Sequence, residues 1–130
     1  MLRKVDAVVL FVQDLDRAVA FYRDTVGVEV IFCDDHSCAL RLEGQDFALL
    51  ARPAAVGMLN EEVVAMRQRA GQQVMLCATV DDVDADYAAL TAKGVTFIHP
   101  PVDQPWGWRA AYFADPDGNI WEFRQSIPEH

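Results

Sequence analysis

Apolar residues along this chain fall into short runs between polar turns, and two segments between those runs have helical periodicity. Residues 5–12 are almost continuously apolar and rich in β-branched side chains, which predicts a buried strand. Asp14 then precedes a segment whose apolar residues recur at helical spacing, and Gly27 supplies its stop. Polar turns separate three further runs, which predict strands at residues 28–32, 38–42 and 47–50.

The second half of the chain repeats this order. An apolar run at residues 74–80 is followed by several aspartates, a helical segment through Leu90 and a stop at Gly94. The string V-Q-D-L-D-R-A from Val12 is similar to V-D-D-V-D-A-D from Val80, and such internal similarity indicates a repeated unit. Further strands are predicted at residues 95–98, 109–113 and 120–124. We therefore expect two β-α-β-β-β modules, at residues 1–51 and 74–130, within one domain.

Residues 52–73 break the pattern between the modules. Pro53 and Gly57 interrupt the periodicity, and a short helix is predicted after Asn60, which is a favourable capping residue. Two interpretations stay open: a solvated linker, or a segment that covers a binding site or an interface.

Composition narrows the function classes. The 130 residues are 52% hydrophobic and carry a formal charge of −9, which argues against disorder, nucleic-acid binding and attraction to an anionic membrane. The longest apolar run near the amino terminus, residues 7–12, is too short for a secretory signal or a membrane span. At least one of the three cysteines is unpaired because their number is odd. An odd number of cysteines suits a reducing cytoplasm. Cys77 lies within an apolar run and is predicted to pack in the core.

Aromatic residues cluster just before the predicted strand at 109–113. Pro105 and Gly107 exclude an ordinary central strand, so this segment is predicted to be a loop that presents Trp106 and Trp108. Indoles stack on planar or cationic ligands but also pack in cores, and both readings stay open for this pair. Trp121 is predicted to be a core residue on the face opposite Glu122.

Three strings carry a family resemblance: V-V-L-F-V-Q-D-L-D-R-A-V-A-F-Y-R-D-T-V-G, P-P-V-D-Q-P-W-G-W-R and A-Y-F-A-D-P-D-G-N-I-W-E-F. Together they resemble the vicinal oxygen chelate superfamily of glyoxalases, bleomycin-resistance proteins and extradiol dioxygenases. The resemblance implies an α+β fold in which two βαβββ modules form a cup-shaped, eight-stranded mixed sheet with the helices outside. It also implies a homodimer that binds small molecules in the cup; the modules pair either within one chain or across the dimer.

Enzymes of that superfamily hold a divalent metal with ligands from the first and last strand of each module. Glu122 matches one of these positions, whereas the other three hold Ala7, Ala48 and Met75. Alanine has no donor atom and a thioether suits hard divalent ions poorly. We therefore expect no metal and no cofactor, with Glu122 as the candidate catalytic group if there is one. A site rebuilt around His36 or His99 stays an open alternative.

Alternation along the strands predicts what lines such a cup, because residues two apart share a face. The expected ligand-binding residues are Ala7, Val9, Phe11, Ala48, Leu50, Met75, Cys77, Trp106, Trp108, Arg109, Glu122 and Arg124. This lining is mostly apolar with one central carboxylate, and it suits an organic ligand with a few polar contacts.

The sequence thus predicts a metal-free, cytoplasmic binding protein of the bleomycin-resistance type. Its ligand would be hydrophobic or aromatic, and the acidic charge of the chain favours a cationic, antibiotic-like molecule. The alternative is a lyase, isomerase or dioxygenase of the same superfamily with a rebuilt divalent-metal site. We expect neither nucleic acid nor membrane as a partner.

Overall fold

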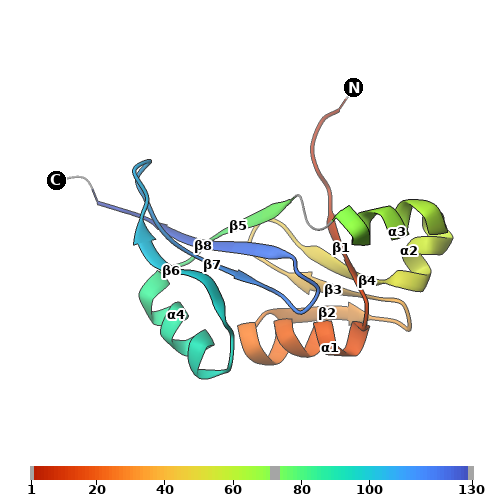
Figure 1. The fold of residues 1–130 in the computed structure, drawn as a ribbon, viewed down its shortest axis with the longest axis horizontal. Coiled ribbons are helices and arrows are strands. Elements are labelled where there is room, and N and C mark those ends of the chain that lie inside the picture. Colours follow the sequence, from red (N-terminus) through yellow and green to blue (C-terminus); the bar gives the residue numbers. More distant parts are fainter. Residues whose placement is uncertain (1, 71–73, 129–130) are drawn as a thin grey trace. The chain divides into compact units, whose positions relative to one another are not determined.

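The computed structural model describes residues 2–70 and 74–128, which leaves residues 71–73 at the end of the expected linker undescribed. The chain divides into two compact units, Met1–Gly71 and Gln72–His130 (Figure 1). Each unit has a four-stranded mixed sheet, with strand orders β1-β4-β3-β2 and β5-β8-β7-β6. The α+β class and the β-α-β-β-β order are confirmed in both units, and the eight expected strands are present as two four-stranded sheets.

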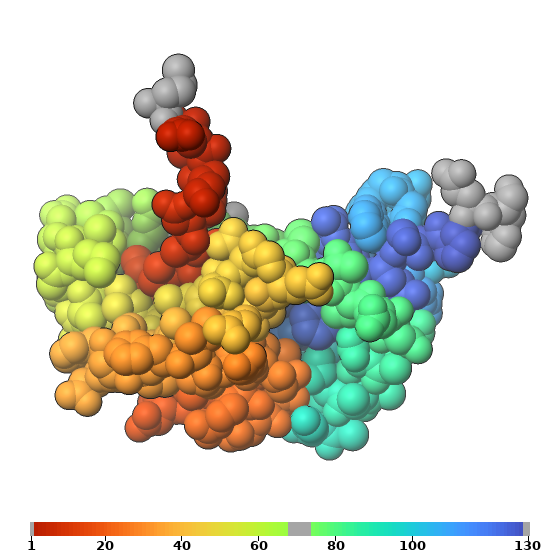
Figure 2. Space-filling view, turned by 180° about the vertical axis from the view of Figure 1, so that it is seen from behind, coloured from red at the N-terminus to blue at the C-terminus, as the bar shows by residue number. Residues whose placement is uncertain are grey.

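The first unit comprises β1 (Val8–Val12), α1 (Leu15–Ala20), the π-helical turn η1 (Phe21–Val26), β2 (Glu29–Cys33), β3 (Ser37–Arg41), β4 (Phe47–Ala51), α2 (Arg52–Met58) and α3 (Glu61–Ala70). The carboxylate of Asp14 accepts a hydrogen bond from the backbone N–H of Arg17 at 3.1 Å, which confirms the predicted cap. Gly27 ends the helical segment with φ 89°, a conformation that glycine adopts freely. Residues 2–7 project from the rest of this unit (Figure 2).

One face of the first sheet packs against α1 and η1. Tyr22 is 1% exposed and lies edge-on against Phe47, with ring centroids 5.2 Å apart. The inward-facing residues of the strands complete this core: Leu10, Val12, Cys38, Leu40, Phe47 and Leu49.

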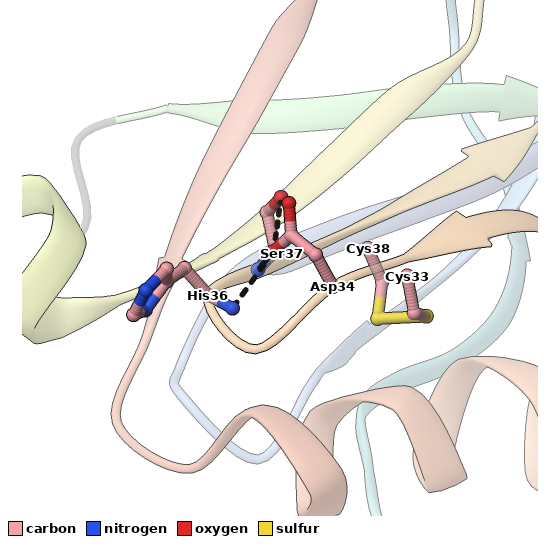
Figure 3. Close-up of a disulfide and its surroundings, with 5 residues drawn as sticks. All are labelled: Cys33, Asp34, His36, Ser37 and Cys38. Carbon is pink, nitrogen blue, oxygen red and sulfur yellow. Dashed lines mark hydrogen bonds between the residues drawn. A yellow bond between two sulfur atoms is a disulfide. The ribbon is translucent and has the colours of Figure 1, made fainter.

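A disulfide joins the two strands of the first hairpin. Cys33 and Cys38 are directly paired across β2 and β3, and their sulfur atoms are bonded (Figure 3). The carboxylate of Asp34 accepts from the backbone N–H groups of His36 and Ser37, both at 2.8 Å, and so orders the turn between them. Because these cysteines are paired, the cysteine count no longer supports a reducing compartment, and a cytoplasmic location stays an untested expectation.

The segment after β4 contains a helix that the sequence pattern did not predict. Pro53 lies in the first turn of α2, where its missing N–H is unneeded and its fixed φ favours the helix. The expected cap of α3 is confirmed, since Asn60 accepts from the backbone N–H of Val63 at 2.8 Å. Leu50, Ala55 and Val64 form a buried cluster, against which Phe11 also packs. The segment therefore covers part of the first sheet and is not merely a solvated linker.

The second unit comprises β5 (Met75–Thr79), α4 (Val83–Ala92), β6 (Phe97–Asp103), β7 (Trp108–Ala114) and β8 (Ile120–Ser126). Strand β6 runs five residues beyond its predicted end, through Pro100 and Pro101, because it lies at the sheet edge where proline is tolerated. One sheet face packs on α4 through Phe97, Phe113 and Phe123, whose rings contact in series. None of the helices described has both the length and the apolar character needed to cross a bilayer.

Candidate functional site

The face of the second sheet that points away from α4 carries an unusual set of polar side chains. Strand register places Glu122 directly between Cys77 on β5 and Tyr112 on β7, and places Arg124 between Thr79 and Ala110. Because directly paired residues point to the same side of a sheet, these side chains share one face. We call it the Glu122 face, with members Met75, Cys77, Thr79, Trp108, Ala110, Tyr112, Ala114, Ile120, Glu122 and Arg124.

A directed chain of hydrogen bonds crosses this face. The amide Nε2 of Gln104 donates to the Tyr112 hydroxyl at 3.1 Å, and that hydroxyl donates to Oε2 of Glu122 at 2.7 Å. The Glu122 side chain is only 6% exposed, so a carboxylate here depends on such donors to offset its desolvation. Burial, and then the bond to Glu122, raise the pKa of Tyr112 above its ordinary value. The hydroxyl is therefore a fixed donor at neutral pH.

Cys77 lies on the other side of Glu122 and is exposed, so the expectation that it packs in the core is wrong. Its alternating position on β5 turns it to the Glu122 face, away from α4, although its neighbours in sequence are apolar. Partial burial of the thiol, and then its hydrogen bond to Glu122, raise the pKa of Cys77. A thiol held in its protonated form is a poor nucleophile, and Cys77 thus acts here as a donor to the carboxylate.

Arg124 completes the polar set. Its Nη1 lies 3.7 Å from Oε1 of Glu122, and its guanidinium carbon lies 4.4 Å from the ring centroid of Trp108. The side chain is one-third exposed, yet its Nε is buried without a hydrogen-bond partner. The structure thus brings together five of the predicted site residues on this face, Met75, Cys77, Trp108, Glu122 and Arg124.

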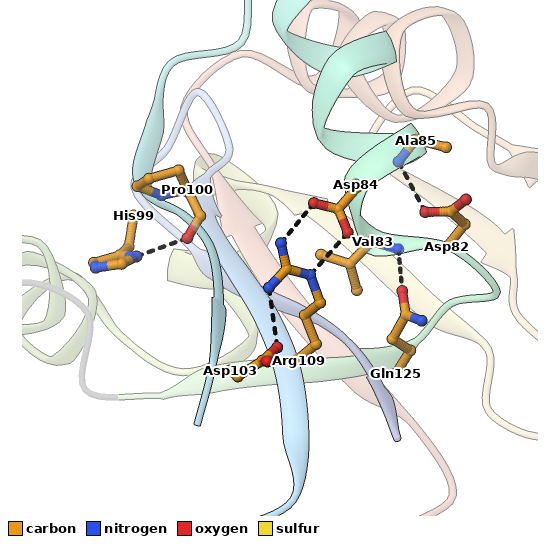
Figure 4. Close-up of polar contacts among 9 residues, drawn as sticks. All are labelled: Asp82, Val83, Asp84, Ala85, His99, Pro100, Asp103, Arg109 and Gln125. Carbon is orange, nitrogen blue, oxygen red and sulfur yellow. Dashed lines mark hydrogen bonds and ion pairs between the residues drawn. The ribbon is translucent and has the colours of Figure 1, made fainter. Parts of the chain in front are cut away.

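Arg109 lies on the opposite side of the same sheet. Its guanidinium donates to both carboxylate oxygens of Asp84 on α4, at 2.8 and 2.7 Å, and to Asp103 on β6 at 2.9 Å (Figure 4). Alternation along β7 explains the separation, because Trp108 and Arg109 are neighbours in sequence and point to opposite faces. The role that the structure gives Arg109 is to hold α4 against the sheet.

The three tryptophans have distinct surroundings. Trp106 is 64% exposed in the turn before β7, whereas Trp108 is partly buried beneath Arg124. Trp121 is 6% exposed on the side that packs against α4, which confirms it as a core residue. Of the two indoles expected to meet a ligand, Trp108 is the one that belongs to the Glu122 face.

The predicted site residues of the first unit show little polar chemistry. Phe11 and Leu50 pack in the cluster beneath α2 and α3. Val9 is 45% exposed, Ala48 is partly buried, and Ala7 is exposed just before β1. A separate hollow of about 360 Å³ lies beside α2, lined by Gln13, Arg52, Pro53, Val56 and Glu61.

The donor set does not fit a divalent metal. Ala7 and Ala48 have no ligating atom, and Met75, 45% exposed on the Glu122 face, offers a thioether. Oε2 of Glu122 already accepts from Tyr112. Within either unit, the described residues contain no group of three His, Cys, Asp or Glu side chains that could hold a metal ion. His36 lies exposed in the disulfide hairpin, and His99 is exposed with its Nδ1 2.7 Å from the carbonyl oxygen of Pro100.

Tyr112 and Gln104 are site residues that the sequence reasoning missed. The signal for Tyr112 was available, because Trp108, Ala110 and Tyr112 alternate along one strand and so share a face. Gln104 gave no such signal. It reaches Tyr112 only because the turn between β6 and β7 returns it to that position.

Comparison with known proteins gives a consistent picture. Residues 4–123 match the Glyoxalase/Bleomycin resistance protein/Dioxygenase superfamily. The uncharacterized protein YraH of Bacillus subtilis is 32% identical over 121 residues, which cover 91% of this chain and 94% of that protein. A glyoxalase/bleomycin resistance protein/dioxygenase from Nocardioides has a TM-score of 0.84 at 25% identity, covering 100% of this chain and 88% of its own. A superfamily member from Sphaerobacter thermophilus has a TM-score of 0.73 at 30% identity, covering 95% and 97%.

Proposed function

The chain belongs to the Glyoxalase/Bleomycin resistance protein/Dioxygenase superfamily, and from that premise we propose that it is a metal-independent small-molecule-binding protein. The proposed binding surface is the Glu122 face of the second unit. Its ligand has an apolar or aromatic body, which rests against Met75 and Trp108. Polar groups on the ligand contact the set around Glu122.

One observation carries this proposal: the buried carboxylate of Glu122 is engaged by protein donors. Its Oε2 accepts from the Tyr112 hydroxyl at 2.7 Å, and Gln104 in turn fixes that hydroxyl. A divalent metal ion requires several donor atoms, whereas the positions that match the other three ligands of the family hold Ala7, Ala48 and Met75. The Glu122 carboxylate is held by a side-chain network instead. Side-chain networks of this kind give a surface defined shape and polarity, which is what recognition of an organic ligand requires.

The experiment is isothermal titration of the chain, purified without chelator, against a panel of aromatic acids, amides, amines and antibiotics. Each titration is run with EDTA and again with Mn²⁺ or Zn²⁺. We expect micromolar to millimolar binding that EDTA leaves unchanged, and weaker binding by Tyr112→Ala and Trp108→Ala. Phe32→Ala is the matched control, because Phe32 is an aromatic residue that is 60% exposed on β2 of the first unit.

Two results would overturn the proposal. One is stoichiometric metal in the purified protein, measured by elemental analysis, together with turnover or binding that is lost in EDTA. That result would favour the alternative of a metal-dependent lyase, isomerase or dioxygenase with a rebuilt site. The other is binding that Phe32→Ala weakens as much as Tyr112→Ala does, since the ligand would then not depend on the Glu122 face.

A further inference from the structure

We infer that the ligand of the Glu122 face is an anion, recognised through a carboxylate or a similar planar acceptor group that Arg124 binds. The inference rests on the proposed function and adds the chemical class of the ligand. It reverses the cationic preference that the net charge of the chain suggested.

Arg124 has donor capacity that the protein leaves unused. A guanidinium carries five N–H groups in a planar fork that matches a carboxylate. The Nε–H of Arg124 is buried and bonds to nothing in the described residues. The nearest anion, Oε1 of Glu122, is 3.7 Å from Nη1, beyond ordinary hydrogen-bond length. An unmatched buried donor is unfavourable. A ligand acceptor can reach the exposed third of the Arg124 side chain, where the guanidinium has no hydrogen bond of ordinary length to the residues that the structure describes.

The guanidinium is also held in position before any ligand arrives. It lies over the Trp108 ring, 4.4 Å from the centroid, and the buried Glu122 carboxylate attracts its other side. These two contacts restrict the rotamers of a long side chain whose ordering on binding would otherwise weaken affinity. Arg124 is one-third exposed, so a small ligand can reach it.

Glu122, in contrast, has little capacity left for a cationic ligand. Its Oε2 accepts from Tyr112, and Cys77 and Arg124 lie on its other sides. Its side chain is 6% exposed. A cationic ligand group would have to displace one of these donors and would meet the charge of Arg124. The formal charge of −9 acts at longer range and is screened over roughly 8 Å at physiological salt. The local arrangement therefore decides the preference.

The test compares three probes that share one aromatic body: 2-naphthoate, 2-naphthamide and 2-naphthylmethylamine. Dissociation constants come from titrations followed by two-dimensional NMR, which also reports whether each variant is folded. Because a charge-assisted hydrogen bond is roughly twice as strong as a neutral one, we expect 2-naphthoate to bind about tenfold or more tightly than 2-naphthamide. The amine should be the weakest of the three.

Arg124→Met should reduce the affinity for 2-naphthoate to that for 2-naphthamide and leave the amide nearly unchanged. Arg124→Lys should recover part of the difference, because an ammonium keeps the charge without the planar fork. Arg41→Met is the matched control, since Arg41 is an exposed arginine on β3 that pairs with Glu29. It should behave as the wild type.

The outcomes separate the two proposals. If the amide or the amine binds the wild type as tightly as the acid does, the anion inference is wrong and the proposed function stands. The same holds if Arg124→Met keeps the preference for the acid. If none of the three probes binds, both the inference and the proposed function are contradicted.

Discussion

The two units pair their strands in the same register, so their outward faces can be compared position by position. Across β1, β4 and β3, the first unit places Val9, Ala48 and Ala39. Across β5, β8 and β7, the second unit places Cys77, Glu122 and Tyr112 at the matching positions. The next row of paired residues on the same face consists of Phe11, Leu50 and Ser37 in the first unit. The matching row in the second unit is Thr79, Arg124 and Ala110. The same backbone arrangement thus carries mostly apolar side chains in the first unit and the Glu122 face in the second.

The difference shows where the chain accepts unfavourable burial. In the first unit, Leu50 and Phe11 pack under α2 and α3, so that face contributes to stability. In the second unit, the Glu122 carboxylate is buried and needs dedicated donors. Apolar residues of similar volume at these positions would often make the fold more stable. The faces that meet α1 and α4, by contrast, are both built from aromatic and aliphatic residues.

The largest effect is expected on the helix-packed faces, where the two units are alike. Phe47→Ala and Phe113→Ala should each lower the free energy of unfolding by about 3–5 kcal/mol, because each ring is almost fully buried among other side chains. Urea denaturation followed by circular dichroism measures this. Phe32→Ala, at an exposed site, should stay within about 0.5 kcal/mol of the wild type. Equal losses at all three positions would contradict the assignment of these faces as core.

The hydrogen bonds of the Glu122 face should contribute less to the free energy of unfolding than the two cores do. Glu122→Ala should lower the free energy of unfolding by about 1–3 kcal/mol, because the Tyr112 hydroxyl loses its acceptor. Glu122→Gln should lose less, since the amide oxygen still accepts from Tyr112. The control is Glu29→Ala, which removes only an exposed ion pair with Arg41 and should change little. If Glu122→Ala leaves the free energy of unfolding unchanged, the hydrogen bond between Tyr112 and Glu122 is not formed in solution.

The disulfide distinguishes the first unit from the second. Reduction with dithiothreitol, or the Cys33→Ser and Cys38→Ser pair, should lower the free energy of unfolding by about 2 kcal/mol, because the bond closes a short loop. The control is Cys77→Ser, which leaves the disulfide intact. Reduction should destabilise this variant as much as it destabilises the wild type. If dithiothreitol has no effect on wild-type unfolding in urea, the bond does not contribute as expected.

The smallest effect is expected in acid, at the pair that holds α4. The hydrogen bond from Arg109 holds the pKa of Asp84 below its ordinary value near 3.8. The stabilisation is therefore fully present above about pH 4 and is lost as the pH falls through the lowered pKa. Asp84→Asn should flatten this part of the stability curve, measured by urea denaturation between pH 6 and pH 2. Parallel curves for the two proteins would contradict the ion pair.

The sequence pattern predicted the strands and both module helices, because each has a clear periodicity between good turn or capping residues. It missed α2, since Pro53 looks like a helix breaker unless the helix is known to begin there. It placed Cys77 in the core because apolar neighbours suggested burial, whereas the strand turns that residue outward. It recognised Glu122 and Arg124 as sharing a face.

The partners of those two residues needed the fold. Gln104 meets Tyr112 through a turn. Arg124 packs over Trp108 because β7 and β8 pair and bring the two side chains to one face. The separation of Arg109 from Trp108 follows from alternation alone. The sequence pattern predicts a loop before residue 109, and alternation gives no rule for a loop, so the pattern does not separate Trp108 from Arg109.

The most direct test of the difference between the units is chemical-shift mapping of ¹⁵N-labelled protein with 2-naphthoate in the presence of EDTA. The account predicts that the amide signals of Cys77, Tyr112 and Arg124 move most. The signals at the matching positions of the first unit, Val9, Ala39 and Leu50, should stay nearly unchanged. Shifts concentrated on those first-unit positions, or shifts that appear only when EDTA is replaced by a divalent metal, would contradict it.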